Sequence, residues 1–219
     1  MSAHGLKNQF PSPAPSQREV DDFCSAAAKG DQAAVAGFLD KYAAAIDQRH
    51  SSGATALTWA AERGDKAMVR LLLDKGAHIE AQDDVGCTPL IRAAYKGHTD
   101  IAALLLQSGA SLEAKTRQER TALMGAALSG HANTVSFLLE KGAAVEGIDV
   151  EGRTAVQLSQ VWGHPETGML IEQWLNMQGQ LKDGELKHAE IRAREQSAER
   201  LEKLKNRRPP KSPLKKNSP

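Results

Sequence analysis

Histidine is the side chain whose spacing in this sequence first points to chemistry. His98, His131 and His164 follow one another at one constant interval, and imidazole is the commonest metal ligand in proteins. Two nitrogens bound to one zinc ion at about 2.1 Å each lie at most about 4 Å apart, whereas adjacent packed helices lie about 8–10 Å apart. We therefore interpret the row as a polar position near the start of successive helices, and we predict neither a metal nor a cofactor.

The remaining motifs that could carry catalysis are incomplete. Gly142 and Gly147 have the spacing of a phosphate-binding loop, but Ile148-Asp149 stands where Lys-Ser/Thr is required. The sequence has no Gly-x-Ser-x-Gly, His-Glu-x-x-His or Gly-x-Gly-x-x-Gly run. Cys24 and Cys87 form no Cys-x-x-Cys pair, and we interpret both as small packing residues rather than reactive thiols. We predict that the protein is not an enzyme.

The composition favours a helical protein, and the distribution of apolar residues indicates where in the cell the protein is located. Hydrophobic residues make up 41% of the 219 residues and aromatic residues only 4%, which is typical of a core built from Ala and Leu. No apolar run exceeds about seven residues, whereas a spanning helix needs about eighteen, and the first twenty residues lack the apolar core of a signal peptide. We expect neither a transmembrane segment nor secretion by means of a signal peptide. We expect a cytoplasmic location, or a nuclear one in a eukaryote.

Charge divides the chain into an acidic body and a basic tail. Residues 21–177 hold 14 basic and 20 acidic side chains, whereas residues 178–219 hold 12 basic and 6 acidic ones. The two segments have opposite charge, and they nearly cancel in the net charge of +1 for the whole sequence.

A fixed period of about 33 residues runs through the sequence and predicts a repeat architecture. Three sets of residues share it: Thr55, Thr88, Thr121 and Thr154; Gly64, Gly97, Gly130 and Gly163; and the Gly-Ala pairs that begin at Gly76, Gly109 and Gly142. The interval from Gly30-Asp31 to Gly64-Asp65 is longer than this period by a single position, which places one additional residue near Tyr42. A fifth, degenerate unit is therefore expected at the front.

Each unit is expected to be a helix, a turn, a second helix and a loop. Thr55 is typical of a helix N-cap, Gly64 of a helix end and Asp65 of the next helix start. The second helix carries an apolar stripe at i, i+3 and i+4, first seen as Val69, Leu72 and Leu73. A unit this short cannot bury its apolar face alone, so we predict that the units stack into an all-α solenoid.

The sequence resembles the ankyrin-repeat family over about residues 20–177, because one unit matches that family's pattern closely. The matching residues are Thr88-Pro89-Leu90, Ala93-Ala94, Gly97-His98, Leu104-Leu105-Leu106 and Gly109-Ala110. Two positions depart from the pattern: the signature His is Thr58, Ile91, Met124 and Gln157, and the common loop Asn is Glu80, Glu113 and Glu146. The resemblance implies stacked helix-turn-helix units with short finger loops.

Four segments are expected along the chain: a Pro/Ser-rich lead-in (1–15), an ankyrin-repeat domain (16–177), a charged helical segment (178–204) and a basic tail (205–219). The units of the domain are predicted at 16–49, 50–82, 83–115, 116–148 and 149–177. Ser16 and Glu19 form a capping box that opens the first helix. We expect the lead-in and the basic tail to be disordered. The charged segment is predicted to be a solvated helix or, as the alternative, a weak coiled coil.

The resemblance also implies a binding surface on the finger loops and the first helix of each unit. Two neighbouring rows on that helix are Glu62, Tyr95, Leu128 and Val161, and Arg63, Lys96, Ser129 and Trp162. Apolar side chains at positions that usually meet solvent indicate a contact patch. Val161 and Trp162 have a second interpretation, in which they cover the segment after residue 177. Finger residues Arg120 and Arg153, with Arg117 nearby, predict a basic edge that is either solvated or part of the site.

The basic tail offers a separate route to binding. Its cations are Lys205, Arg207, Arg208, Lys211, Lys215 and Lys216, and they could meet nucleic acid, anionic lipid, an acidic protein surface or the chain's own acidic repeats. We predict a monomeric, non-catalytic scaffold or adaptor that binds an unidentified partner protein through the concave ankyrin face. The alternative is a tail-driven binder of nucleic acid or anionic membrane, with the repeats as regulator.

Overall fold

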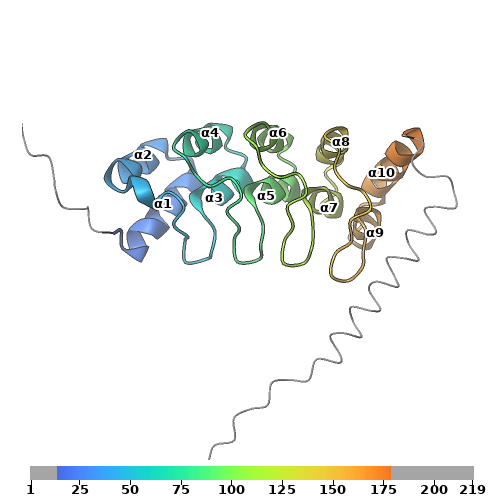
Figure 1. Ribbon diagram of the computed structural model, residues 1–219, viewed down its shortest axis with the longest axis horizontal. Coiled ribbons are helices and arrows are strands. Elements are labelled where there is room, and N and C mark those ends of the chain that lie inside the picture. Colours follow the sequence, from blue (N-terminus) through green and yellow to red (C-terminus); the bar gives the residue numbers. More distant parts are fainter. Residues whose placement is uncertain (1–13, 179–219) are drawn as a thin grey trace, which may run out of the picture.

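Residues 14–178 are described by a computed structural model, and they form two parallel rows of helices (Figure 1). The first row is α1 (Gln17–Lys29), α3 (Ala56–Arg63), α5 (Pro89–Lys96), α7 (Ala122–Leu128) and α9 (Ala155–Val161). The second row is α2 (Gln32–Lys41), α4 (Lys66–Asp74), α6 (Thr99–Gln107), α8 (Ala132–Glu140) and α10 (Pro165–Met177). Within this range there is no strand. Four loops project beyond the first row; we call them finger 1 (47–54), finger 2 (78–87), finger 3 (111–120) and finger 4 (144–153).

The helix starts follow from side chains that accept backbone N–H groups. Thr55 accepts the N–H of Thr58 and Asp65 accepts that of Met68, at 3.3 and 2.9 Å, and the other three repeated threonines cap α5, α7 and α9 in the same way. Ser16 and Glu19 form the predicted capping box. Hydrogen bonds from the Ser16 backbone N–H, Lys41, the Ser16 hydroxyl and Tyr42 lower the pKa of Glu19 to about 2.

Small side chains let the first-row helices lie against one another. Ala60-Ala61, Ala93-Ala94 and Ala126-Ala127 are completely buried, and they recur at the predicted period. Leucines of the second row, Leu72, Leu105 and Leu138, complete the core with no exposed surface. Burial of one such side chain stabilises the fold by about 1.5–3 kcal/mol, so the continuous core depends on stacking.

The additional residue near Tyr42 is absorbed by a turn. A short 3₁₀ helix, η1 (Ala43–Ala45), follows α2 directly, and the Tyr42 hydroxyl donates a hydrogen bond to Glu19 at 2.9 Å. The first unit therefore accommodates its irregular length outside its two helices.

The last unit departs from the inner ones on its outer side. Ile91 and Met124 are buried between units, whereas Gln157, in the same register, forms a capping box with Thr154 at the start of α9. Ser159 replaces a buried alanine, and Gly168 leaves room for its hydroxyl, because a Cβ on Gly168 would lie 2.5 Å from Ser159 Oγ.

Several predictions fall outside residues 14–178. They are most of the lead-in (residues 1–13), the helix or coiled coil predicted from 179 onward, and the basic tail with Lys205, Arg207, Arg208, Lys211, Lys215 and Lys216. Among the helices of the described range, none is long and apolar enough to cross a membrane. The unit boundaries stay a prediction.

Candidate functional site

One side chain at the same register position closes the hairpin turn of each finger. The four residues are His50, Asp83, Thr116 and Asp149. Asp83 Oδ1 accepts the backbone N–H groups of Val85 and Cys87 at 3.0 and 2.9 Å, and Asp149 Oδ1 accepts those of Glu151 and Arg153 at 2.9 and 3.0 Å. These bonds stabilise tight hairpin turns, so the finger tips are held in a defined position.

Carboxylates tie each unit to the next at the finger bases. Asp47, Glu80 and Glu113 accept the backbone N–H groups of His78, Ser111 and Ala144 at 2.8, 2.7 and 2.8 Å. Glu80 and Glu113 are two of the loop positions where the sequence departs from the family's asparagine. The substitution therefore keeps a hydrogen-bond acceptor between units.

The histidine row has the same inter-unit role. His98 Nε2 lies 3.0 Å from the Glu62 carbonyl oxygen, and His131 Nε2 lies 3.0 Å from that of Tyr95. Because a carbonyl oxygen only accepts, the imidazole N–H is the donor. Each ring covers a glycine of the preceding unit: a Cβ on Gly97 would lie 2.6 Å from His131 Nδ1. Among residues 14–178 no group of His, Cys, Asp or Glu is arranged to hold a metal ion.

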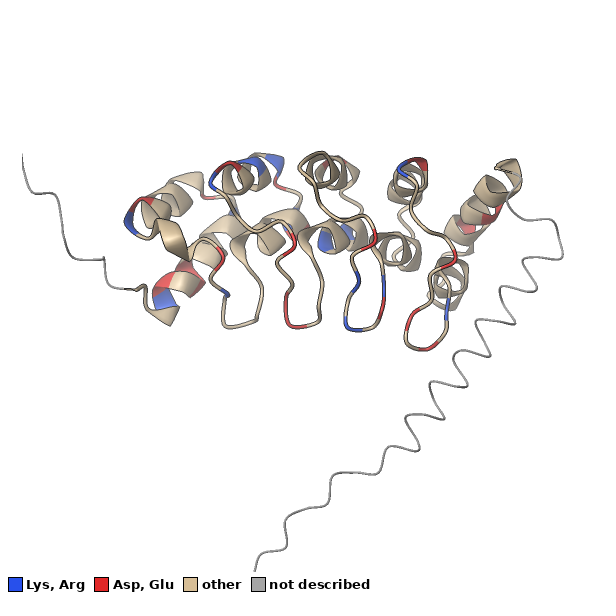
Figure 2. Cartoon of the chain, viewed as in Figure 1, with Lys and Arg blue, Asp and Glu red and all other residues tan. Residues whose placement is uncertain are grey.

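Charge alternates along the fingers (Figure 2). Finger 2 is acidic, with Glu80, Asp83 and Asp84; finger 3 has a small excess of basic residues, with Lys115, Arg117 and Arg120 against Glu113 and Glu119; and finger 4 is acidic, with Glu146, Asp149 and Glu151 against Arg153. The backbone joins the fingers as well: the Arg117 N–H donates to Val85 O at 3.1 Å, and the Val150 N–H donates to Gln118 O at 3.0 Å. Fingers 2 to 4 therefore form a connected edge.

The predicted basic edge is wrong for Arg120. Its side chain is only 11% exposed, and Nε and Nη2 both lie 3.2 Å from Asp149 Oδ2. Arg153 donates to the same oxygen at 2.9 Å through Nη2. The Asp149 side chain is completely buried, and a buried carboxylate needs such partners. Arg120 therefore joins finger 3 to finger 4, and Arg153 pairs within finger 4, which leaves Arg117 as the exposed member of the three arginines.

The pKa of Asp149 reflects the same arrangement. Burial raises the pKa of Asp149. The lowering effects are larger in sum: hydrogen bonds from the backbone and guanidinium of Arg153, the positive charge of Arg153 and a hydrogen bond from the Glu151 N–H. The net shift of the pKa is therefore downward from the ordinary value. Asp149 is therefore ionised near neutral pH.

Arg92 is the centre of a second ionic group, at the junction of α3 and α5. Its guanidinium donates to Asp83 Oδ2, with Nε at 2.7 Å and Nη2 at 2.5 Å, and Nη1 lies 4.0 Å from Glu62. Lys96 Nζ is 3.2 Å from Glu62. The predicted site residues Glu62 and Lys96 thus lie together, and Arg92 and Asp83, which the site prediction missed, connect them to finger 2.

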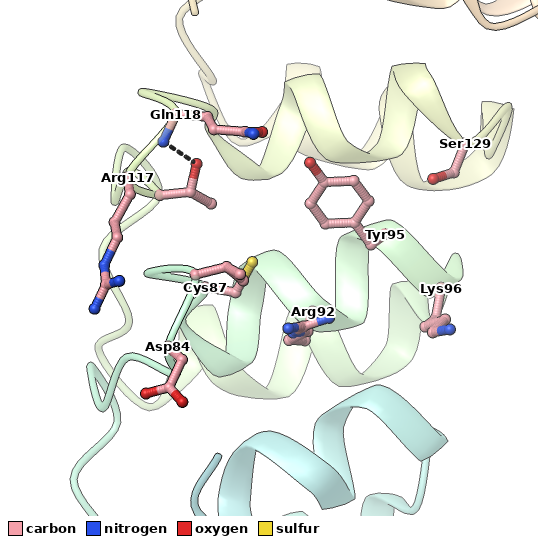
Figure 3. A pocket seen from close by; sticks show the side chains of 10 residues that line it. Asp84, Cys87, Arg92, Tyr95, Lys96, Arg117, Gln118 and Ser129 are labelled. Carbon is pink, nitrogen blue, oxygen red and sulfur yellow. Dashed lines mark hydrogen bonds between the residues drawn. The ribbon is translucent and has the colours of Figure 1, made fainter. Parts of the chain in front are cut away.

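A hollow of about 570 Å³ opens where fingers 2 and 3 meet α5 and α7. We call the surface between the fingers and the first-row helices the finger–helix face; it corresponds to the predicted concave face. In Figure 3 Tyr95 points from α5 toward α7, with Arg117 at the finger side and Lys96 and Ser129 at the opposite side. Gly125 of α7 makes room for the ring, because a Cβ there would lie 3.0 Å from Tyr95 Cδ2. Burial raises the pKa of Cys87, which also lines the hollow, to about 11, so its thiol is protonated and unreactive.

A smaller hollow of about 270 Å³ adjoins the first. It is lined by Ser52, Ala54, Trp59, Glu62 and residues 83–85, with Arg92. Asp84, Val85 and Arg92 line both hollows. The two hollows therefore follow one another along the finger–helix face, one at the α3–α5 junction and one at the α5–α7 junction.

The remaining predicted residues do not line either hollow. Leu128 is half-buried beside Ser129, and Arg63 is exposed at the end of α3. Val161 and Trp162 are 66% and 56% exposed at the end of α9, on the last unit rather than beside the hollows. The structure thus groups Glu62, Tyr95 and Lys96, and it leaves the apolar pair apart.

These elements define a class: a helical-repeat solenoid with a hollowed face between its helices and its fingers. The family model for ankyrin repeats (3 copies) matches residues 23–116 and 113–172. The chain belongs to the ankyrin-repeat family, and the predicted fold is confirmed. Ankyrin repeats are generally protein–protein interaction modules, and proteins built from them are typically non-enzymatic scaffolds. A comparison with curated proteins found no match.

Proposed function

We propose that this protein is a non-catalytic adaptor that binds a partner protein through the finger–helix face. The observation that carries the proposal is the hollow of about 570 Å³ between α5, α7 and fingers 2 and 3. It combines a half-buried aromatic ring, Tyr95, with charged side chains at its edges. Aromatic and Arg side chains are the residues that most often supply binding energy at protein interfaces.

Rigidity supports the same conclusion. Buried or half-buried ion pairs fix the hairpin turns of fingers 2 and 4, and backbone hydrogen bonds join neighbouring fingers. A surface that is ordered before binding loses little conformational entropy when a partner docks. A cytoplasmic location and a monomeric state belong to the same proposal, which suits two cysteine thiols that are free and buried.

The test compares capture by matched variants. Tyr95→Ala with Leu128→Ala removes apolar side chains from the finger–helix face, whereas Arg70→Ala with Asp100→Ala changes exposed positions on second-row helices. Proteins captured from a native lysate should be lost with the first pair and retained with the second, and the helical circular dichroism should be the same in both. Equal capture by the two pairs would contradict the proposal. Loss of all capture on deletion of residues 205–219 would favour the tail instead.

A further inference from the structure

The two adjoining hollows differ in the sign of their charged lining. The smaller one is lined by three carboxylates, Glu62, Asp83 and Asp84, and by one cation, Arg92. The larger one is lined by three cations, Arg92, Lys96 and Arg117, and by one carboxylate, Asp84. Arg92 and Asp84 are shared by both hollows, and Arg92 is already neutralised by its close ion pair with Asp83. The finger–helix face therefore has a negative end at the α3–α5 junction and a positive end at the α5–α7 junction.

We propose that this face binds an extended peptide segment that carries one basic and one acidic side chain, with the basic one in the smaller hollow. The inference rests on the proposed adaptor function and names the chemistry of its partner. Complementary charges at an interface set register and orientation. The two ends of the face differ in sign, so the segment binds in one orientation only.

The smaller hollow has features that favour a cation. Trp59 lines it together with Glu62 and Asp84, and an indole ring attracts a Lys or Arg side chain placed over its face. The Asp84 side chain is 65% exposed and its nearest cation, Arg49, is 4.0 Å away. This carboxylate is therefore free to exchange a weak exposed contact for one with the ligand.

The larger hollow has features that favour an anion. Arg117 is exposed and makes no ion pair with any residue in the range 14–178. Lys96 is 50% exposed and lies 3.2 Å from Glu62, whose side chain is 25% exposed, so the Lys96 ammonium group remains accessible from the hollow. An acidic side chain beside Tyr95 would lie between these two cations. The positive charge of the larger hollow is opposite in sign to the net charge of residues 21–177, which is acidic.

Repeat geometry sets the spacing of the two charged side chains. The hollows lie at consecutive junctions of packed helices, so their centres are about 8–10 Å apart. An extended chain advances about 3.3–3.6 Å for each residue. The basic and acidic side chains should therefore be about two or three residues apart.

The experiment selects peptides from a random displayed library on the whole protein and measures the affinity of synthetic peptides by fluorescence polarisation. Selected peptides should carry a basic and an acidic side chain about two or three residues apart, and high salt should weaken their binding. Arg117→Glu should weaken binding about tenfold, whereas Lys115→Glu, the same charge change on the same finger outside the hollow, should change it less than about twofold.

A charge exchange tests the polarity itself. The double variant Asp84→Lys with Arg117→Glu should prefer the peptide with its two charged residues interchanged. Selection of peptides with one sign of charge, selection of none, or equal binding by the Arg117→Glu and unaltered proteins would overturn the inference. If partner capture survives Arg117→Glu but is lost with Tyr95→Ala and Leu128→Ala, the adaptor function stands and only the inferred peptide chemistry falls.

Discussion

Arg120 of finger 3 and Asp149 of finger 4 form a buried ion pair, with Nε and Nη2 both 3.2 Å from Oδ2. They are 29 residues apart in the sequence, and the carboxylate also accepts two backbone N–H groups of its own finger. One side chain therefore determines the turn of finger 4 and its attachment to finger 3.

Asp149→Ala should lower the free energy of unfolding by about 3 kcal/mol, because it leaves the Arg120 guanidinium and two backbone N–H groups without their buried acceptor and leaves Arg153 with the exposed Glu151. Urea denaturation followed by circular dichroism measures the change. Glu151→Gln is the control: the Glu151 side chain is 60% exposed, and its loss should cost less than about 1 kcal/mol. A decrease in unfolding free energy for Asp149→Ala that is no larger than the decrease for Glu151→Gln would show that the Arg120–Asp149 pair is not structurally important.

The stabilisation by Asp149 should depend on pH. Its pKa is lower in the folded protein than in the unfolded chain, so its contribution is complete above the unfolded pKa of about 3.9 and is lost as pH falls through the folded pKa. The gap in unfolding free energy between the unaltered protein and Asp149→Asn should be constant from about pH 5 to 7 and should narrow below about pH 4. A gap that widens on acidification would contradict the assigned direction.

Gly97→Ala should destabilise the fold by about 3 kcal/mol. Gly97 has a φ of 75°, where alanine costs about 1–2 kcal/mol, and the new Cβ would also meet the His131 ring at 2.6 Å. Gly109→Ala separates the two causes, since its φ is 95° but no atom lies within 4 Å of the added Cβ. Thermal unfolding of both variants, and of Gly97→Ala with His131→Ala, should show that the double change recovers part of the loss.

Glu119→Gly should stabilise the protein by about 1 kcal/mol. Glu119 has a φ of 60°, and it is the one residue other than glycine with positive φ in the described range. Gly53, Gly86 and Gly152 occupy the same position in the other fingers, with φ of 82°, 83° and 75°. Glu119→Ala is the control, because it removes the contact with Lys115 but keeps the strained backbone. An unfolding midpoint for Glu119→Gly that does not exceed that for Glu119→Ala would contradict the interpretation.

Local signals in the sequence were sufficient for the fold. The N-cap threonines, the glycines that end the helices and the apolar stripe each act within one or two helical turns, so their effects can be predicted without tertiary structure. Their repetition at one fixed period then implied that the same local units pack on one another.

The site was harder to predict because its contacts join neighbouring units. The role of Arg120 depends on a carboxylate 29 residues away, and that of Arg92 on Asp83 and Glu62 together. A usable signal was present at the fingers: Asp83 and Asp149 each stand three residues before a finger glycine, Gly86 or Gly152. That spacing indicates a carboxylate-closed turn, but it does not reveal which arginine reaches the second oxygen.

The glutamine at the start of α9 has a consequence for the length of the array. Where Ile91 and Met124 offer hydrocarbon to a neighbour, Gln157 folds back onto the backbone of Thr154, and Gln160 is exposed in the register of the buried Ala94 and Ala127. Extension of the array by a further unit behind α9 and α10 would require isoleucine at position 157 and alanine at position 160, because the two glutamine side chains place polar amides where the added unit would need an apolar packing surface.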